Sequence, residues 1–190
     1  MEKIPTYFER DWEGDRSRVL DQVHEGCEWV LAGEGVSTRK YDGTCVMYDG
    51  ERWWARRDVR EGKPTPDGFV ATGETDPETG KTPGWEPIEQ SPFAKFHEEA
   101  VAAVREEDSG IPFPVGTYEL LGPKVQGNPE KTEGHKLLLH SGADVLTVED
   151  RSYEGIRQAL EGLDVEGIVF HHPDGRRAKI KKRDFGLKRD

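Results

Sequence analysis

Two Asp-Gly pairs, each set between two short strand-like runs, constrain the fold of this sequence more than any other feature. Residues 45–48 alternate into Asp49-Gly50, and residues 53–57 form the return run. Residues 165–171 and 177–182 flank Asp174-Gly175 in the same way. Asp-Gly in this position is a strong signal for a tight β-hairpin turn, because glycine readily adopts the positive φ that such turns need. The chain is therefore expected to contain antiparallel sheet.

The other segments predict more short strands and a few helices. Strands are expected at residues 27–32, 36–40, 115–121, 136–140 and 145–148, and a short helix near residues 16–25, within a polar lead-in at 1–26. Ser91 and Pro92 have the residue types of a helix start, with Gly110 at the end, and Ser152 begins a helix that stops at Gly162. Residues 60–92, rich in Gly, Pro and charge, are interpreted as a loop over the substrate site.

This mixture predicts an α+β fold with antiparallel sheets and helices, in one domain spanning residues 1–190. No run approaches the roughly 18 apolar residues of a membrane span, and residues 1–5 lack the apolar segment of a signal peptide. We therefore expect a cytoplasmic protein without a membrane partner. Cys27 and Cys45 would be reduced thiols in that compartment.

The charge is unevenly distributed. The net charge is −11, but residues 176–190 hold eight Lys/Arg against Asp184 and Asp190, a local charge of +6 that leaves −17 for residues 1–175. The net charge argues against a general nucleic-acid binder. A basic strip on an acidic body can still hold a polyanion locally, although a solvated charged tail would look the same in the sequence.

The chemistry is expected to centre on Lys40, in the stretch KYDGT. Lysine is a nucleophile only when its amine is neutral, and nearby cations and desolvation lower its pKa toward that state. Lys179 and Lys181 lie two apart on a predicted strand, so both face the same side and can supply cations or bind a phosphate. Glu166, on the other arm of that hairpin, can hold a metal or orient the amine.

Each of these signals also has a structural interpretation. A Lys-x-Lys pair on a strand is usually a solvated face, Glu-Gly-Ile-Val reads as a buried strand with an acidic start, and K-x-D-G occurs by chance. Glu119, at the end of another strand, offers an acceptor for a ribose hydroxyl, and Gly43 lets backbone approach a ligand closely. The order and spacing of these stretches carry more information than any one of them.

Taken in order, KYDGT, WARRD, TYELLG, VEGIVFHH and AKIKK resemble the motifs of the covalent nucleotidyltransferases: ATP-dependent RNA ligases, DNA ligases and mRNA capping enzymes. The resemblance covers residues 27–187 and is strongest to small ATP-dependent 5′–3′ RNA ligases. It implies a nucleotide cleft between antiparallel sheets flanked by helices, and an enzyme that forms lysyl-AMP, adenylates an RNA 5′-phosphate and joins it to a 3′-hydroxyl. It also implies ATP with Mg²⁺ or Mn²⁺, and RNA ends as partners.

The resemblance also implies individual roles. Lys40 would be the catalytic nucleophile, Thr38 would give backbone contacts to adenine, and Asp42 and Gly43 would shape the pocket floor. Arg56 would touch ribose or phosphate, with Arg57 as the alternative because the register is uncertain by one residue. The remaining ATP-binding residues would be Glu119 at the ribose, His140 stacked on adenine, Glu166 at the metal and the amine, and Lys179 and Lys181 at the α-phosphate.

Two departures from the family pattern matter. DNA ligases carry an arginine soon after K-x-D-G, whereas Thr44, Cys45 and Val46 follow here, which favours RNA. The chain also ends at Asp190, so no C-terminal oligonucleotide-binding (OB) domain is expected. The alternatives are a DNA ligase, a GTP-using capping enzyme, or a non-catalytic nucleotide- or RNA-binding module. Trp53, Trp54 and Trp85 are available for base stacking on RNA, although core packing is the usual role of such residues.

Overall fold

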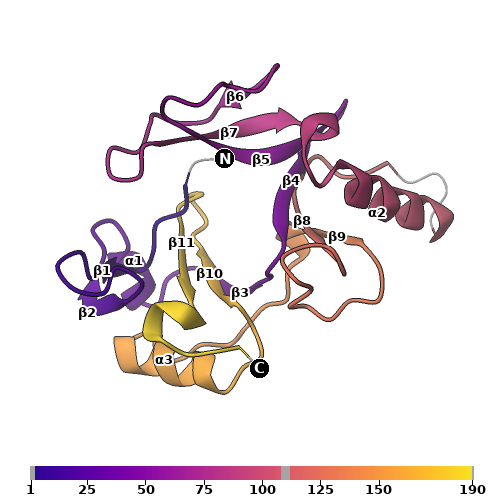
Figure 1. The fold of residues 1–190 in the computed structure, drawn as a ribbon. Helices are drawn as coiled ribbons and strands as arrows, with labels where there is room; N and C mark the ends of the chain where they lie inside the picture. The colour runs from indigo at the N-terminus through magenta and orange to yellow at the C-terminus, as the bar shows by residue number, and fades with distance from the viewer. Residues whose placement is uncertain (1–2, 108–111, 190) are drawn as a thin grey trace. The chain divides into compact units, whose positions relative to one another are not determined.

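The computed structural model describes residues 3–107 and 112–189, and its α+β elements form two compact units (Figure 1). The first, called the lysine unit, comprises Ile4–Tyr41 and Ala143–Asp190. The second, called the large-sheet unit, comprises Asp42–Gly142 together with Met1–Lys3. The boundary between Tyr41 and Asp42 falls inside KYDGT.

The lysine unit is built on an antiparallel sheet in the order β11-β10-β3. A separate β1-β2 hairpin precedes it in the chain. Its elements are β1 (Phe8–Arg10), β2 (Val19–Val23), α1 (Glu28–Leu31), β3 (Val36–Lys40), α3 (Tyr153–Glu161), β10 (Gly167–His171), β11 (Arg177–Lys181) and a 3-10 helix at Lys182–Phe185.

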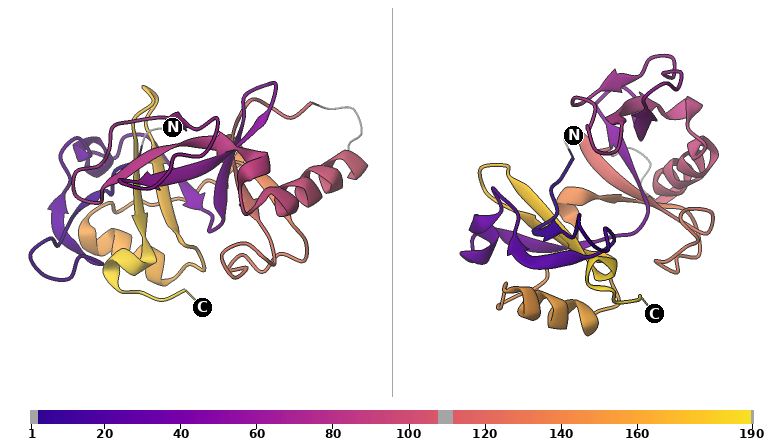
Figure 2. Two further views of the ribbon diagram at one scale, coloured as in Figure 1. Left: turned by 45° about the horizontal axis from the view of Figure 1, so that its top comes forward. Right: turned by 60° about the vertical axis from the view of Figure 1, so that its left-hand side comes forward.

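One face of this sheet forms the core of the lysine unit. Alternate strand residues point to opposite faces, and on one face Ile168, Phe170 and Ile180 are completely buried. They pack with Ile156 and Leu160 of α3, which lies against the sheet in both views of Figure 2. The opposite face is therefore the one whose side chains are available for chemistry.

The large-sheet unit is built on an antiparallel sheet in the order β6-β7-β5-β4-β8-β9. Its elements are β4 (Thr44–Tyr48), β5 (Trp53–Arg60), β6 (Val70–Ala71), β7 (Lys81–Pro87), a 3-10 helix at Ile88–Gln90, α2 (Ala94–Glu107), β8 (Gly116–Leu121), β9 (Lys136–Leu139) and a 3-10 helix at His140–Gly142.

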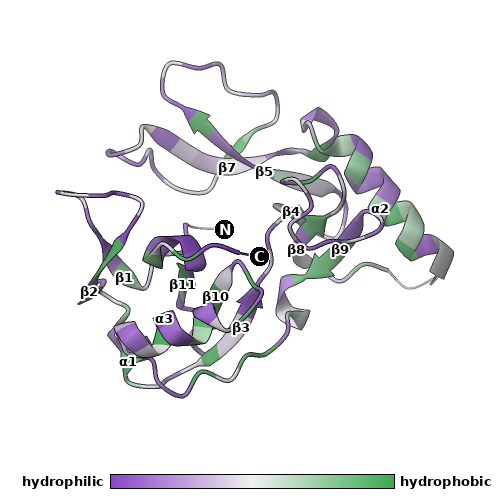
Figure 3. Cartoon of the chain, turned by 60° about the horizontal axis from the view of Figure 1, so that its bottom comes forward, coloured by the Kyte–Doolittle hydropathy of each residue, from purple (hydrophilic) through white to green (hydrophobic). Residues whose placement is uncertain are grey.

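The core of this unit lies on the α2 side of the sheet. Val46, Ala55 and Tyr118 pair across β4, β5 and β8, so they share one face, and Ala100 of α2 packs with them. Figure 3 shows hydrophobic and hydrophilic residues alternating along α2, as expected for a helix with one buried side. Trp53 packs against this core with Tyr48, His97, Phe113 and Tyr118.

The structure confirms the elements that carry strong local signals. Both Asp-Gly hairpins are present, as β4-β5 and β10-β11. Ser152 caps α3 by accepting a hydrogen bond from the Gly155 N–H at 3.2 Å, and Gly162 ends that helix. The strand expected at residues 36–40 is β3, and the one expected at 115–121 is β8.

Several sequence predictions are wrong. Residues 16–25 contain β2 and no helix, and residues 27–32 contain α1 in place of a strand. In the described chain, residues 145–148 contribute an isolated bridge from Val145 to Thr38 and form no strand.

Residues 60–92 are more regular than predicted, because they contain β6 and β7, and β7 pairs with β5 along its whole length. The helix after Ser91 begins at Ala94, and the expected stop at Gly110 lies outside the described residues. His140 falls in a 3-10 helix beyond the end of β9. Within the described ranges, no helix is long and apolar enough to span a membrane.

Candidate active site

The open face of the lysine unit carries its polar side chains in rows across the strands. Lys40 of β3 and Lys181 of β11 both lie directly opposite Gly167 of β10. Thr38 and Lys179 lie opposite Val169 in the next row. Residues opposite each other in adjacent strands point to the same face, so the register gathers Thr38, Lys40, Lys179 and Lys181 on one side of the sheet, as the sequence predicts for the two AKIKK lysines.

A carboxylate joins two of these lysines. Glu166 accepts a hydrogen bond from the Lys40 ammonium on one oxygen and from the Lys181 ammonium on the other. Lys40 Nζ also lies 3.3 Å from the Tyr41 carbonyl oxygen. The exposed fraction is 20% for the Lys40 side chain, 13% for Glu166 and 16% for Lys181. The cluster is therefore largely withdrawn from water but still accessible to a ligand.

Burial and charge act in opposite directions on these groups. Burial by itself would raise the pKa of Glu166, but the charges of Lys40 and Lys181 outweigh it and hold the pKa below its usual value. Burial, with the nearby charges of Lys181 and Lys40, lowers the pKa of Lys179 from 10.5 to about 8. Three cations around one carboxylate leave an excess of positive charge, which suits a phosphate group.

Gly167 has a specific place in this cluster. A Cβ at this position would lie 2.1 Å from the carbonyl oxygen of Ile180 and 2.9 Å from Cα of Lys181. No other residue fits without moving β11 away from β10. The two residues of the EG pair in VEGIV therefore have different roles. Glu166 supplies a carboxylate to the two lysines, and Gly167 lacks the side chain that would push β11 away from β10.

His171 belongs to the same face and was not singled out from the sequence. It pairs with Val36 and Arg177 in the third row, and its Nε2 lies 3.0 Å from the Thr38 hydroxyl. The signal was present in the strand alternation, since residues 167, 169 and 171 share one face. His171 extends the polar surface beyond the lysines.

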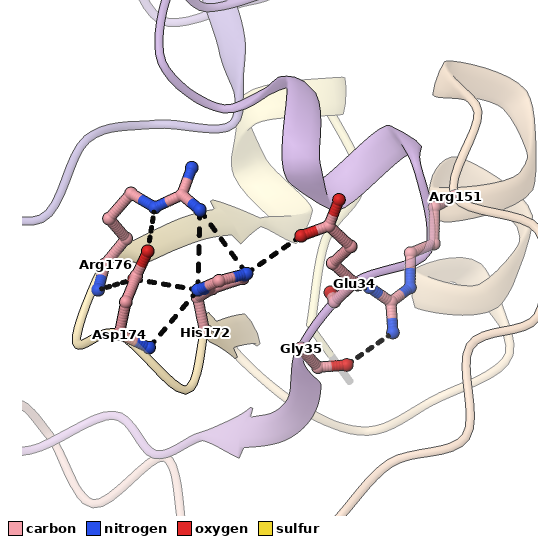
Figure 4. A network of polar contacts seen from close by, with 6 residues as sticks. All are labelled: Glu34, Gly35, Arg151, His172, Asp174 and Arg176. Atoms are coloured by element: carbon pink, nitrogen blue, oxygen red, sulfur yellow. Dashed lines mark hydrogen bonds and ion pairs between the residues drawn. The ribbon is translucent and has the colours of Figure 1, made fainter.

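The far end of the β10-β11 hairpin is held by a polar network (Figure 4). His172 contacts Glu34 through Nε2 and Asp174 through Nδ1, both at 2.8 Å, and Asp174 also pairs with Arg176. The Arg176 guanidinium lies over the Trp29 ring, 5.6 Å from its centroid. Glu34 and Trp29 precede β3 in the chain, so this network fastens the hairpin turn to the segment that leads into β3.

A second group of predicted residues meets in the large-sheet unit. Glu119 is 8% exposed and accepts a hydrogen bond from the Gly43 N–H at 3.0 Å. Its other oxygen lies 2.8 Å from His140 Nε2, whose Nδ1 is 2.9 Å from the Thr117 hydroxyl. The structure thus brings Gly43, Glu119 and His140 together, and both ring nitrogens of His140 have a hydrogen-bonding partner.

Asp42 and Gly43 are fixed by backbone contacts. The Asp42 N–H donates to Glu130 at 2.9 Å, a residue that the sequence reasoning missed because its partner lies 88 positions away. A Cβ on Gly43 would lie 2.3 Å from the carbonyl oxygen of Leu120. The absence of a side chain at Gly43 therefore allows strand β8 to approach closely, and a close approach to a ligand stays a prediction.

Arg56 of β5 and Glu119 of β8 are separated by strand β4. Ala55, the neighbour of Arg56, pairs with Val46 on the core face, so Arg56 lies on the opposite face, which also carries Glu119. Arg57 lies on the core side, 3.9 Å from the buried Glu86. Arg56 has Asp58 at 3.9 Å and the Trp85 ring at 5.7 Å. Of the two candidates, Arg56 is therefore the one that shares a sheet face with Glu119.

The donor chemistry of the lysine unit fits a nucleotide polyphosphate. The ammonium groups of Lys40, Lys179 and Lys181 suit phosphate oxygens. Residues 3–107 and 112–189 contain no group of three His, Cys, Asp or Glu side chains placed to hold a metal ion. One carboxylate, Glu166, remains compatible with Mg²⁺, which commonly binds through one or two carboxylates together with substrate phosphates and water.

Comparison with known proteins gives a distant similarity. No protein-family model matches this sequence. The chain is 25% identical over 166 residues to RNA ligase 1 from Pongo abelii and 26% identical to RNA ligase 1 from Rattus norvegicus, in each case covering 72% of this chain and 48% of the other protein. The chain thus spans about half the length of the curated relatives it matches, and the similarity supports an RNA-ligase-like relationship.

Proposed function

We propose that this protein is an ATP-dependent RNA ligase with a nucleotidyltransferase fold, in which Lys40 becomes adenylylated. The observation that carries the proposal is the Glu166 carboxylate held between Lys40 and Lys181, with Lys179 on the same sheet face. The similarity to two proteins named RNA ligase 1 supports the choice of RNA over other acceptors.

In the first step the neutral amine of Lys40 attacks the α-phosphorus of ATP. A nitrogen–phosphorus bond forms, the bond from phosphorus to the bridging oxygen of pyrophosphate breaks, and pyrophosphate leaves with that electron pair. The amine releases a proton to solvent. Glu166 orients the amine through its hydrogen bond and, with its low pKa, remains a carboxylate rather than storing that proton.

The two lysines of β11 stabilise the charge that develops on the α-phosphate oxygens. Preorganised cations in a partly dehydrated site are effective in this role, because they need no rearrangement as the charge develops. Bound Mg²⁺ would neutralise phosphate charge and, by sharing Glu166, favour deprotonation of Lys40. Lys179 and Lys181 come from alternate positions of one strand, which keeps both ammonium groups on the nucleophile's side.

The later steps transfer AMP from Lys40 to an RNA 5′-phosphate, after which a 3′-hydroxyl displaces AMP and seals the strand. Within the same proposal, Thr38 contacts the nucleotide base and Asp42 and Gly43 line its pocket. Glu119 and His140 bind ribose and adenine, and Arg56 contacts ribose or phosphate. Glu119→Gln tests this assignment separately, since it should raise the ATP concentration needed for half-maximal labelling while Lys40 can still react.

The experiment is covalent labelling with α-labelled ATP or GTP and Mg²⁺. We expect label from ATP on the wild type and none on Lys40→Ala or Lys40→Arg, because arginine keeps the charge but is not deprotonated at usable pH. Lys188→Ala, which removes an exposed lysine of the same unit, is the matched control and should label normally. A wild type that takes no label from either nucleotide would refute the proposal, and label from GTP alone would favour a capping enzyme.

A second arm distinguishes the acceptor. The labelled protein is offered nicked or free-ended RNA, and the same ends in DNA. Release of AMP with sealing of RNA is the expected result. Sealing of DNA alone would make the protein a DNA ligase, and a labelled protein that seals neither would be limited to the first step.

A further inference from the structure

The N-terminal segment extends the catalytic sheet past β11. Thr6 forms a parallel bridge with Lys179. The Tyr7 N–H donates to the Lys179 carbonyl oxygen at 2.8 Å, and the Lys179 N–H donates to the Pro5 carbonyl oxygen at 3.0 Å. Lys179 lies at a position where its backbone groups point away from β10, so the N-terminal segment satisfies both of them.

Lys181 has the same orientation but lies beyond the reach of that bridge. Its N–H donates instead to the Asp184 carboxylate, at 2.9 Å. Asp184 is 2% exposed, and its other oxygen accepts a hydrogen bond from Arg10 at 3.2 Å. Arg10 ends β1, so a residue near the N-terminus holds the group that fixes the backbone of Lys181.

A second arginine of the N-terminal hairpin holds the same turn. Arg18 donates to the carbonyl oxygen of Arg183 at 3.1 Å, in the 3-10 helix that follows Lys181. Its guanidinium lies over Gly186, where a Cβ would come within 2.2 Å of it, and Gly186 has a φ of +79°. Arg10 and Arg18 therefore contact the turn after β11 at two separate points.

We infer that residues 4–23 position the two lysines of β11 for reaction, with Arg10 acting on Lys181 through Asp184. Asp184 accepts a hydrogen bond from the Lys181 main chain, and Arg10 donates to Asp184. Both are therefore positioning residues. The reactive role of the lysines rests on the proposed function. The interpretation of residues 1–26 as a polar lead-in is wrong for this segment, because Tyr7 and Phe8 are part of the buried core.

The test is single-turnover adenylation at saturating ATP, read as a rate constant and an amplitude. Arg10→Gln is expected to lower the rate constant by about 10- to 100-fold, because displacements near 1 Å can cost about 100-fold. Arg10→Lys keeps a charge for Asp184 and should restore much of the rate. Arg157→Gln, which removes an arginine paired within α3, is the control and should change the rate less than about 2-fold.

A double-mutant cycle separates positioning from general destabilisation. If Arg10 acts through Lys181, Arg10→Gln should cost little more than about 2-fold in a Lys181→Ala background, since coupled residues are not additive. Equal fold-losses in both backgrounds would overturn the inference. So would a loss confined to the amplitude, which reports the fraction of folded protein rather than the geometry of the site.

Backbone hydrogen exchange decides the inference without any activity. Arg10→Gln should speed exchange in β11 and in residues 182–186 while leaving β4 and β5 unchanged. Unchanged exchange in β11, or faster exchange throughout the protein, would overturn the positioning role. If the wild type forms no covalent adduct, the proposed function fails. Hydrogen exchange would still show whether Arg10 holds β11 and the turn after it in place.

Discussion

Replacing Gly167 by alanine tests the contact between β10 and β11 on which the lysine cluster depends. The added Cβ would lie 2.1 Å from the Ile180 carbonyl oxygen, whereas real Cβ contacts below 3.0 Å essentially do not occur. The two strands must therefore separate by about 0.9 Å at the row that holds Lys40 and Lys181. Overpacking of this kind costs about 1–3 kcal/mol of the free energy of unfolding.

The same displacement should affect chemistry more than stability. A shift near 1 Å in a positioned catalytic group can lower a rate by about 100-fold. Urea unfolding and single-turnover adenylation of Gly167→Ala measure the two effects. Gly162→Ala is the control, because its φ is −80° and the nearest atoms to its Cβ lie at 4.0 Å, so both quantities should stay near wild type. A Gly167→Ala protein with wild-type stability and wild-type rate would refute the reasoning.

Two further predictions concern stability alone. Burial lowers the pKa of His97 from 6.5 to about 4, and the charge of Glu89 partly offsets this shift. Between pH 6.5 and pH 4 the unfolded state therefore binds one proton more than the folded state. As the pH falls through this range, the free energy of unfolding should drop by about 3 kcal/mol because of this group. Urea unfolding as a function of pH should show a smaller drop for His97→Phe than for the wild type; equal slopes for the two proteins would contradict the assignment. Ser152→Ala removes the α3 cap and should cost about 1 kcal/mol in the same assay, whereas an unchanged midpoint would mean that the cap contributes nothing.

The parts of the fold that could be predicted from the sequence are those with local causes. Asp49-Gly50 and Asp174-Gly175 determine their own turns, and Ser152 and Gly162 delimit α3 by contacts within a few residues. Because the β10-β11 hairpin was predictable, so was the approach of Glu166 to Lys179 and Lys181. Lys40 was linked to them by family resemblance, and pairing of β3 with β10 supplies the physical connection.

The errors occur where distant partners decide the structure. Strand β7 contains Pro83 and Gly84, which argue against a strand locally, yet pairing with Asp58 and Arg57 of β5 keeps it extended. The apolar run at residues 27–32 is too short for its period to separate helix from strand, and it forms α1.

The supporting contacts of the site were missed for the same reason. Glu130 bonds the Asp42 backbone across 88 positions, and Arg10 reaches Asp184 across 174. No local pattern marks either residue, because each becomes relevant only once the strands around it are paired. His171 could have been found from alternation along β10, since it shares a face with Gly167.

The most direct test of the central claim is to map the covalent adduct by peptide mass spectrometry after incubation with ATP and Mg²⁺. The prediction is one adenylyl group, carried by the peptide that contains Lys40, lost in Lys40→Ala and discharged when 5′-phosphorylated RNA is added. An adenylyl group on Lys179 or Lys181, or no adduct on a folded wild-type protein, would contradict the assignment of Lys40 as the nucleophile.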